Sequence, residues 1–169
     1  MRERWMPNMN KTRFRGFLRR AYQLAEENSP DPSTKVGAII VHSIGEFYGW
    51  NHTPKGIEID LTDRVLKYKA IEHAERHAIF NAARHGIALL NTTLVCPWAA
   101  CADCARAIAL SGIARVICHG DALDKTPERW QQDIELAAKI FEGSGVRYVK
   151  WYGKVGGCKN LFDGRVWEP

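Results

Sequence analysis

Long apolar runs are missing from this 169-residue sequence, and none approaches the roughly 20 residues that a membrane span requires. The basic N-terminal stretch is not followed by an apolar core, so it does not resemble a secretory signal. Internal repeats and low-complexity segments are also absent. We therefore expect a protein without membrane contacts, located in the cytoplasm.

Acidic residues are scarce at the N-terminal end. The first twenty residues contain Glu3 as their single acidic side chain and seven basic ones, a net charge of +6. The other 149 residues sum to about −1, because the whole chain carries +5. The basic character therefore belongs to one end, where we expect an arm at residues 1–12. This arm and the helix after it form either a solvated surface or a patch that recognises phosphate or RNA.

The composition of the chain is that of an ordinary globular protein, with 46% hydrophobic and 25% charged residues. At this length a single domain with a sizeable core is expected. We place that domain at residues 13–152, followed by a Gly-rich tail at residues 153–169. Apolar residues near the end of the tail, at 161–167, predict that it packs against the domain or a neighbouring subunit.

The hydrophobic pattern predicts alternating helices and strands. Apolar residues three and four positions apart indicate a helix at 13–28, which ends before Pro30 and Pro32. The segment 61–72 is ambiguous between a loop and a short helix. We expect further helices at 73–84, 101–110 and 128–141, a hairpin of strands at 36–42 and 46–50, and strands at 92–95, 114–118 and 146–152. Strands that alternate with helices favour a sheet covered on both faces.

A histidine and two cysteines form the ligand pattern of a catalytic zinc site. His73 and the pair Cys101 and Cys104 each lie where a predicted helix begins, and helix N-termini favour thiolates. One imidazole and two thiolates leave the fourth position of zinc open for water, as catalytic sites require. We predict one catalytic Zn²⁺ per chain.

Glu75, two residues after His73, is placed to work beside that water without binding the metal. Zinc would acidify the water, and Glu75 would carry its proton to a ring nitrogen and then to a departing amine. This apparatus suits hydrolytic removal of ammonia from an aminopyrimidine. A structural zinc would instead need a fourth protein ligand, and a redox pair would not account for the His-x-Glu motif.

These motifs resemble the zinc-dependent cytidine deaminase superfamily, whose signature is H-x-E followed by P-C-x-x-C. Two upstream stretches are similar to its deoxycytidylate (dCMP) deaminase branch. Residues 33–38 resemble the entry to the first strand of that family, and residues 49–56 resemble its G-Y-N-G-x-P-x-G loop. About 20 residues separate this loop from His73, as in the same branch. The resemblance extends over residues 29–120.

The resemblance implies a three-layer αβα sandwich around a five-stranded mixed sheet, in a homo-oligomer (a dimer or a hexamer). It also implies conversion of dCMP to dUMP plus ammonia, in pyrimidine nucleotide metabolism. Asn51 would hydrogen-bond the sugar, since an amide offers both a donor and an acceptor. The candidate phosphate ligands are Ser33, Lys35 and Lys55, and the remaining expected substrate contacts are Trp98 and Ala74.

Four positions depart from the family pattern. Ala100 stands where Pro is usual, Trp98 enlarges the preceding loop, and Trp50 and His52 replace Tyr and Gly. These departures leave open another aminated substrate: a nucleoside, a modified cytidine nucleotide or a tRNA adenosine. A non-catalytic, zinc-stabilised nucleic-acid-binding module is a further alternative. Nucleic acid is not favoured, because no basic run is interleaved with stacking aromatic residues. No Cys occurs in residues 51–72, so we expect no second, structural zinc.

Overall fold

The computed structural model describes residues 11–98 and 100–169, so the first ten residues of the expected basic arm lie outside the described part. The helices are α1 (Lys11–Asn28), α2 (Arg64–Ala70), α3 (Ala74–Arg84), α4 (Ala102–Leu110), α5 (Gly120–Leu123) and α6 (Glu128–Ser144). The strands are β1 (Gly37–His42), β2 (Gly45–Trp50), β3 (Thr93–Val95), β4 (Arg115–His119), β5 (Arg147–Trp151), β6 (Asn160–Phe162) and β7 (Arg165–Trp167). None of these helices is long and apolar enough to cross a membrane.

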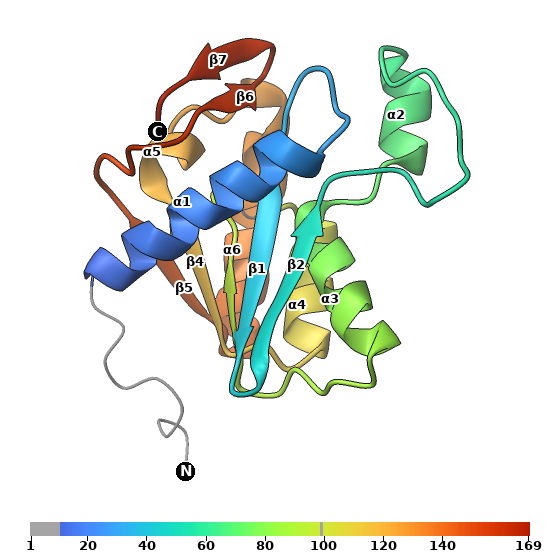
Figure 1. Cartoon of the computed structure of the whole chain (residues 1–169). Coiled ribbons are helices and arrows are strands. Elements are labelled where there is room, and N and C mark those ends of the chain that lie inside the picture. The colour runs from blue at the N-terminus through green and yellow to red at the C-terminus, as the bar shows by residue number, and fades with distance from the viewer. Residues whose placement is uncertain (1–10, 99) are drawn as a thin grey trace.

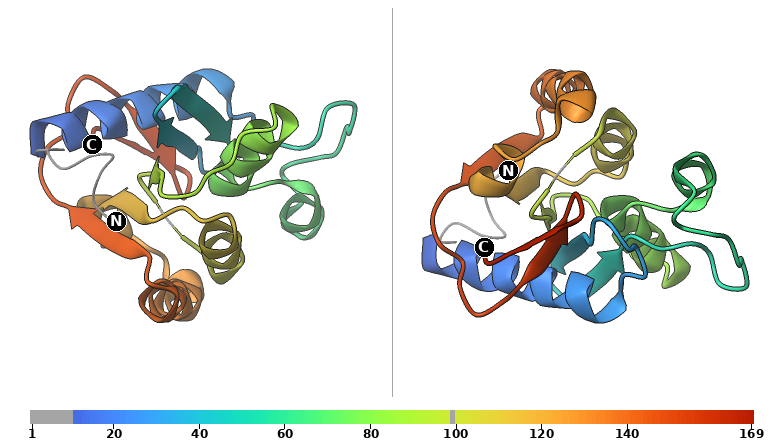
Figure 2. Two further views of the ribbon diagram at one scale, coloured as in Figure 1. Left: turned by 90° about the horizontal axis from the view of Figure 1, so that it is seen from below. Right: turned by 90° about the horizontal axis from the view of Figure 1, so that it is seen from above.

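The expected mixed sheet of five strands is confirmed, in the order β2-β1-β3-β4-β5. Strand β1 is antiparallel to both β2 and β3, whereas β3, β4 and β5 run parallel. Helix α1 covers one face, and α3, α4 and α6 cover the other (Figures 1 and 2). The expected α/β fold with helices on both sides of the sheet is therefore present.

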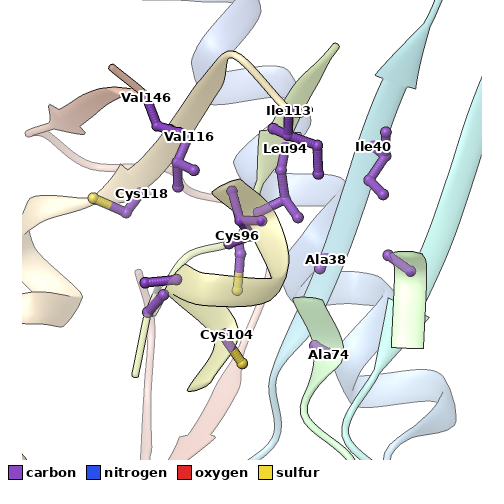
Figure 3. Packing of buried hydrophobic residues seen from close by; sticks show 14 of the residues in the cluster. Ala38, Ile40, Ala74, Leu94, Cys96, Cys104, Ile113, Val116, Cys118 and Val146 are labelled. Atoms are coloured by element: carbon purple, nitrogen blue, oxygen red, sulfur yellow. The ribbon is translucent and has the colours of Figure 1, made fainter. Parts of the chain in front are cut away.

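The core has two parts because side chains alternate between the faces of a strand. Ile39, Val95 and Ile117 pack under α1. Their neighbours in the strands point to the other face, where Figure 3 shows Leu94 and Cys96 among the buried side chains. This second cluster continues into the first turns of α3 and α4 through Ala74 and Cys104. The helix ends that carry the zinc-motif residues are thus anchored in the core.

The elements differ from the predicted bounds mainly at helix ends. Helix α1 begins at Lys11, and α6 continues to Ser144, where Gly145 ends it in a left-handed conformation with φ of 74°. The ambiguous segment 61–72 contains the short helix α2, whose N-cap Asp63 accepts hydrogen bonds from two backbone N–H groups. In Figures 1 and 2, α2 stands apart from the sheet.

The C-terminal tail lies against its own chain. Strands β6 and β7 pair as an antiparallel hairpin beside α1 (Figure 1). The guanidinium of Arg19 donates to the carbonyl oxygens of Val155 and Gly156 at 2.9 and 2.7 Å. The backbone N–H of Lys35 donates to the Leu161 carbonyl at 2.9 Å. The boundary between domain and tail at residue 153 stays a prediction.

Helix α3 lies unusually close to β2 at a glycine. A Cβ atom on Gly49 would be 2.2 Å from the Ala74 carbonyl oxygen and 2.4 Å from the Ala78 nitrogen, far inside van der Waals contact. Both are backbone atoms, so no side-chain rotation can relieve the overlap. The absence of a side chain at Gly49 therefore sets the position of the first turn of α3.

We expect Gly49→Ala to lower the free energy of unfolding by about 1–3 kcal/mol or more, because the added methyl group must push α3 away from the sheet. Chemical denaturation measures this change. Gly16→Ala is the matched control, since its added Cβ would have no atom within 4 Å apart from the neighbouring residues and backbone of its own helix. In helix α1 that change should stabilise by up to about 1 kcal/mol. Equal stabilities of the two variants would contradict the proposed packing constraint.

Candidate active site

Two helix N-termini bring the three predicted zinc ligands together. His73 is the N-cap residue of α3 and Cys101 is the N-cap residue of α4, with Cys104 in the first turn of α4. The Nδ1 atom of His73 lies 3.4 Å from Cys101 Sγ and 3.6 Å from Cys104 Sγ. All three ligand atoms lie within 4.8 Å of one another.

This arrangement fits tetrahedral zinc. With Zn–S bonds of about 2.3 Å and a Zn–N bond of about 2.0–2.1 Å, tetrahedral geometry separates sulfur from nitrogen by about 3.6 Å. Among the described residues, the cluster contains no fourth His, Cys, Asp or Glu ligand. A structural zinc site is normally closed by a fourth protein ligand, whereas a catalytic one keeps a position open. The donor set therefore favours a catalytic site.

Hydrogen bonds stabilise the Cys101 thiolate, whereas the hydrogen bond with Cys101 and burial raise the pKa of Cys104 well above its usual value. Hydrogen bonding with Cys104 and with His73 lowers the pKa of Cys101 to about 4. The guanidinium of Arg76 donates to Cys104 Sγ at 3.5 Å and also pairs with Glu72. The Glu72 carboxylate in turn accepts the backbone N–H of His73 at 2.9 Å. Glu72 and Arg76 thus link the two halves of the cluster, in the way that outer residues orient metal ligands.

Glu75 lies within the same site but outside the ligand set. Its side chain is buried, with only 3% of the residue exposed, and it lines a cavity together with His73 and Cys101. Burial raises the pKa of Glu75 to about 7. A carboxyl group with a pKa near neutrality can both accept and return a proton. The catalytic role of Glu75 stays a prediction.

The cavity has a volume of about 410 Å³ and is walled by aromatic rings. The ring centroid of Trp98 lies 4.8 Å from that of Phe162 and 6.0 Å from that of Trp130. Tyr68 extends this wall, 5.7 Å from Trp130, which is itself 6.5 Å from the His73 ring. Flat apolar walls beside a metal site suit a planar heterocyclic base.

Comparison with known proteins places the chain in a family. Residues 11–120 match the family model described as the cytidine and deoxycytidylate deaminase zinc-binding region. The chain belongs to this family. It is therefore a deaminase, and His73, Cys101 and Cys104 lie within the zinc-binding region of the family.

Individual relatives agree with the family. An uncharacterised deaminase of Aliivibrio fischeri, from the luxG 3' region, is 35% identical over 143 residues, covering 80% of this chain and 92% of that protein. The mouse deoxycytidylate deaminase is 29% identical over 141 residues, covering 78% and 75%. The crystal structure of dCMP deaminase from the cyanophage S-TIM5 in complex with dCMP and dUMP has a TM-score of 0.66 at 24% identity, covering 85% of this chain and 99% of that one. This structural similarity shows the shared fold.

The structure brings some of the predicted substrate residues to the cavity and not others. Ser33, Asn51 and Trp98 line it. Lys35 and Lys55 are not among the described lining residues. The Nζ of Lys35 donates instead to the Glu26 carbonyl at 3.0 Å, and Lys55 is exposed. Ala74 is absent from that lining too, because it is fully buried against β2. The substrate contacts assigned to these residues stay predictions.

The Asn51 amide is fully engaged within the chain. Its Oδ1 accepts from Ser29 Oγ at 2.7 Å and from the Val36 N–H at 2.8 Å. Its Nδ2 donates to the Thr34 carbonyl at 2.8 Å and to Asp31 Oδ2 at 3.3 Å. A primary amide has two donor hydrogens and one acceptor oxygen with two lone pairs, so every site has a partner. A sugar hydroxyl would have to replace one of these bonds.

Several cavity residues were not predicted. Lys67 and Arg64 come from α2, Arg129 and Trp130 come from the start of α6, and Asp163 comes from the β6–β7 turn. The apolar residues at 161–167 signalled that the tail packs, but not what it packs against. Charged residues on a short helix are ordinarily solvated, so the sequence contains no signal for Lys67 or Arg64.

We expect the purified protein to hold about one zinc ion per chain, and His73→Ala or Cys104→Ala to lose it, because two ligands bind zinc far more weakly than three. Elemental analysis after gel filtration measures the metal content. Cys158→Ala is the matched control, since this half-buried cysteine packs near α1, outside the ligand cluster. Full zinc retention in Cys104→Ala would show that the metal is bound elsewhere.

Proposed function

We propose that the protein is a zinc-dependent dCMP deaminase, which converts dCMP to dUMP and ammonia with one catalytic Zn²⁺ per chain. The observation that carries this proposal is the buried Glu75 in an aromatic cavity beside a three-ligand cluster. Relatives named deoxycytidylate deaminase, from mouse, human and phage T4, support dCMP as the substrate. The reaction belongs to pyrimidine nucleotide metabolism, and we expect a cytoplasmic homo-oligomer, either a dimer or a hexamer.

The chemistry follows from the groups in the cavity. When bound to His73, Cys101 and Cys104, zinc supplies a water molecule acidified for attack on the amino-bearing carbon of the base. The Glu75 carboxylate takes a proton from this water and delivers it to the adjacent ring nitrogen. It then transfers the second proton of the same water molecule to the amine, which leaves as ammonia when the bond from carbon to nitrogen breaks. Because burial keeps the pKa of Glu75 near neutrality, one carboxyl group can fill both roles.

The walls of the cavity position the nucleotide. The Trp98 ring contacts those of Trp130 and Phe162, and Trp130 lies beside His73, where the cytosine would lie. Trp98 is held in place by its indole N–H, which donates to Thr126 Oγ1 at 2.9 Å. Asn51 also lines the cavity and would bind the sugar by exchanging one of its internal partners.

Glu75→Gln should retain zinc while losing turnover by about 10²–10⁴-fold, because the amide cannot accept a proton. Ammonia release and metal content are measured on the same preparation. Glu135→Gln serves as the control, since Glu135 is exposed on α6 and absent from the cavity lining. An active Glu75→Gln variant would exclude the assigned proton path.

We expect ammonia release from dCMP to exceed that from deoxycytidine, cytidine or a tRNA anticodon stem-loop at the same concentration. A panel of these compounds, assayed with the zinc-loaded protein, ranks them directly. Equal kcat/KM values for dCMP and deoxycytidine would remove phosphate recognition from the proposal. Tight, salt-dependent binding of nucleic acid without ammonia release would instead favour the binding-module alternative.

A further inference from the structure

One end of the catalytic cavity is built by residues outside the segment that matches the family, residues 11–120. The start of α6 contributes Arg129 and Trp130, and the β6–β7 hairpin contributes Phe162, Asp163 and Gly164. These residues line the same cavity as His73 and Glu75. The C-terminal tail is thus part of the wall that a substrate at the zinc cluster would meet.

Of the residues that the structure describes, three with cationic side chains line the cavity, and they differ in how firmly each is held. Lys67 is buried and donates to Asp31 Oδ1 at 3.2 Å and to Ser33 Oγ at 2.7 Å. Asp31 Oδ1 also accepts two backbone N–H groups, so breaking this ion pair would disrupt a whole loop. Lys67 therefore has a structural role and is not available to bind a ligand.

The second and third cations, Arg64 and Arg129, come from different helices, and both interact with Tyr68. The guanidinium of Arg64 donates to the Tyr68 hydroxyl at 3.3 Å. Arg129 pairs with Asp163, and hydrogen bonding to Asp163 is the main cause of its raised pKa, with a further contribution from Tyr68. Two guanidinium groups near one hydroxyl group, from α2 and α6, give this part of the cavity lining a positive charge.

Arg129 can exchange its partner Asp163 for another anion, whereas Lys67 cannot exchange Asp31. The side chains of Arg129 and Asp163 are 42% and 47% exposed, against 6% and 5% for Lys67 and Asp31. Water screens an exposed ion pair and solvates the partner that is released, so breaking the pair requires little free energy. A phosphate group offers guanidinium more charge and more acceptor oxygens than a carboxylate does.

The hairpin turn does not depend on this ion pair. The backbone N–H of Gly164 donates to the Ser33 carbonyl at 2.8 Å, and that of Asp163 donates to Thr34 Oγ1 at 3.1 Å. Asp163 has a φ of 48°, a left-handed conformation that Asn and Asp tolerate. Its carboxylate can therefore leave Arg129 while the turn stays in place.

We propose that Arg129 recognises the 5′-phosphate of the nucleotide, and that Asp163 occupies Arg129 until the nucleotide binds. This inference rests on the proposed function, because it requires a phosphorylated substrate at the zinc cluster. On binding, the guanidinium of Arg129 exchanges the Asp163 carboxylate for the phosphate oxygens. The C-terminal hairpin then contributes to the choice between nucleotide and nucleoside.

Kinetics on dCMP and deoxycytidine test the exchange. Arg129→Gln should raise KM for dCMP by about 10- to 100-fold, the range of a hydrogen-bonded charge, and should change kcat/KM for deoxycytidine far less. Asp163→Asn keeps the shape of the side chain and removes the competing charge, so it should lower KM for dCMP several-fold. In the Arg129→Gln background, Asp163→Asn should have no further effect.

A purely structural ion pair gives a different pattern. Asp163→Asn would then raise KM for dCMP, as Arg129→Gln does, and both variants would affect deoxycytidine equally. Either result would overturn the proposal. Arg106→Gln is the matched control, because Arg106 forms an exposed ion pair with Asp103 on α4 and neither residue lines the cavity. It should leave both KM values unchanged.

Binding of inorganic phosphate separates this inference from the proposed function. Phosphate should raise the melting temperature of the zinc-loaded wild type weakly and that of Asp163→Asn more strongly, with no effect on Arg129→Gln. This pattern would support the inference even if dCMP were not deaminated, in which case the proposed function alone would fail. Equal responses of the three proteins would refute the inference, whatever the activity on dCMP.

Discussion

The backbone contact between α3 and β2 at Gly49 determines where the chemistry takes place. His73 and Glu75 belong to the first residues of α3, and their distance from α4 depends on how closely α3 lies on the sheet. A Cβ atom on Gly49 would lie 2.2 Å from the Ala74 carbonyl oxygen, so a side chain there would push the first turn of α3 away from the sheet. The spacing of the predicted zinc ligands therefore depends on a contact that none of them makes. Helices α3 and α4 then meet at their N-termini, where their partial positive charges favour the thiolates of the site.

A buried polar network fixes the positions of the segments that form another part of the cavity wall. Asp31, Asn51 and Lys67 bring together the end of α1, the entry to β1, the end of β2 and helix α2. Burying an ion pair such as Lys67–Asp31 gains little net stability, because both charges lose their hydration. The ion pair instead fixes the position of α2. This helix stands apart from the sheet (Figure 1), and its buried residue Lys67 connects it to the cavity wall.

The sequence predicts the parts of this protein that depend on local patterns. Hydrophobic periodicity identified the strands and the long helices, and the spacing of His73, Glu75, Cys101 and Cys104 identified the candidate catalytic cluster. Contacts between distant segments have no such pattern. The residues around Lys67 do not indicate that it contacts Ser33, and those around Asp163 do not indicate that it contacts Arg129. Both contacts result from tertiary packing. For the same reason Lys35 and Lys55, chosen for their charge near a motif, lie away from the cavity lining.

The local sequence motif determines the type of reaction, whereas the cavity wall, which tertiary packing assembles, determines the choice of substrate. In the proposed mechanism, three zinc ligands and one carboxyl group would perform the same hydrolysis on any aminated base that reached them. Selection among bases and phosphorylated forms depends on the surrounding wall, which in this chain includes α2, α6 and the tail. The basic side chains of α1 are not part of that wall. Arg20 pairs with Glu46, and Arg19 binds carbonyl oxygens of the tail. Within the described residues, the positive charge that faces the cavity therefore comes from Arg64, Lys67 and Arg129 and not from the basic end of the chain.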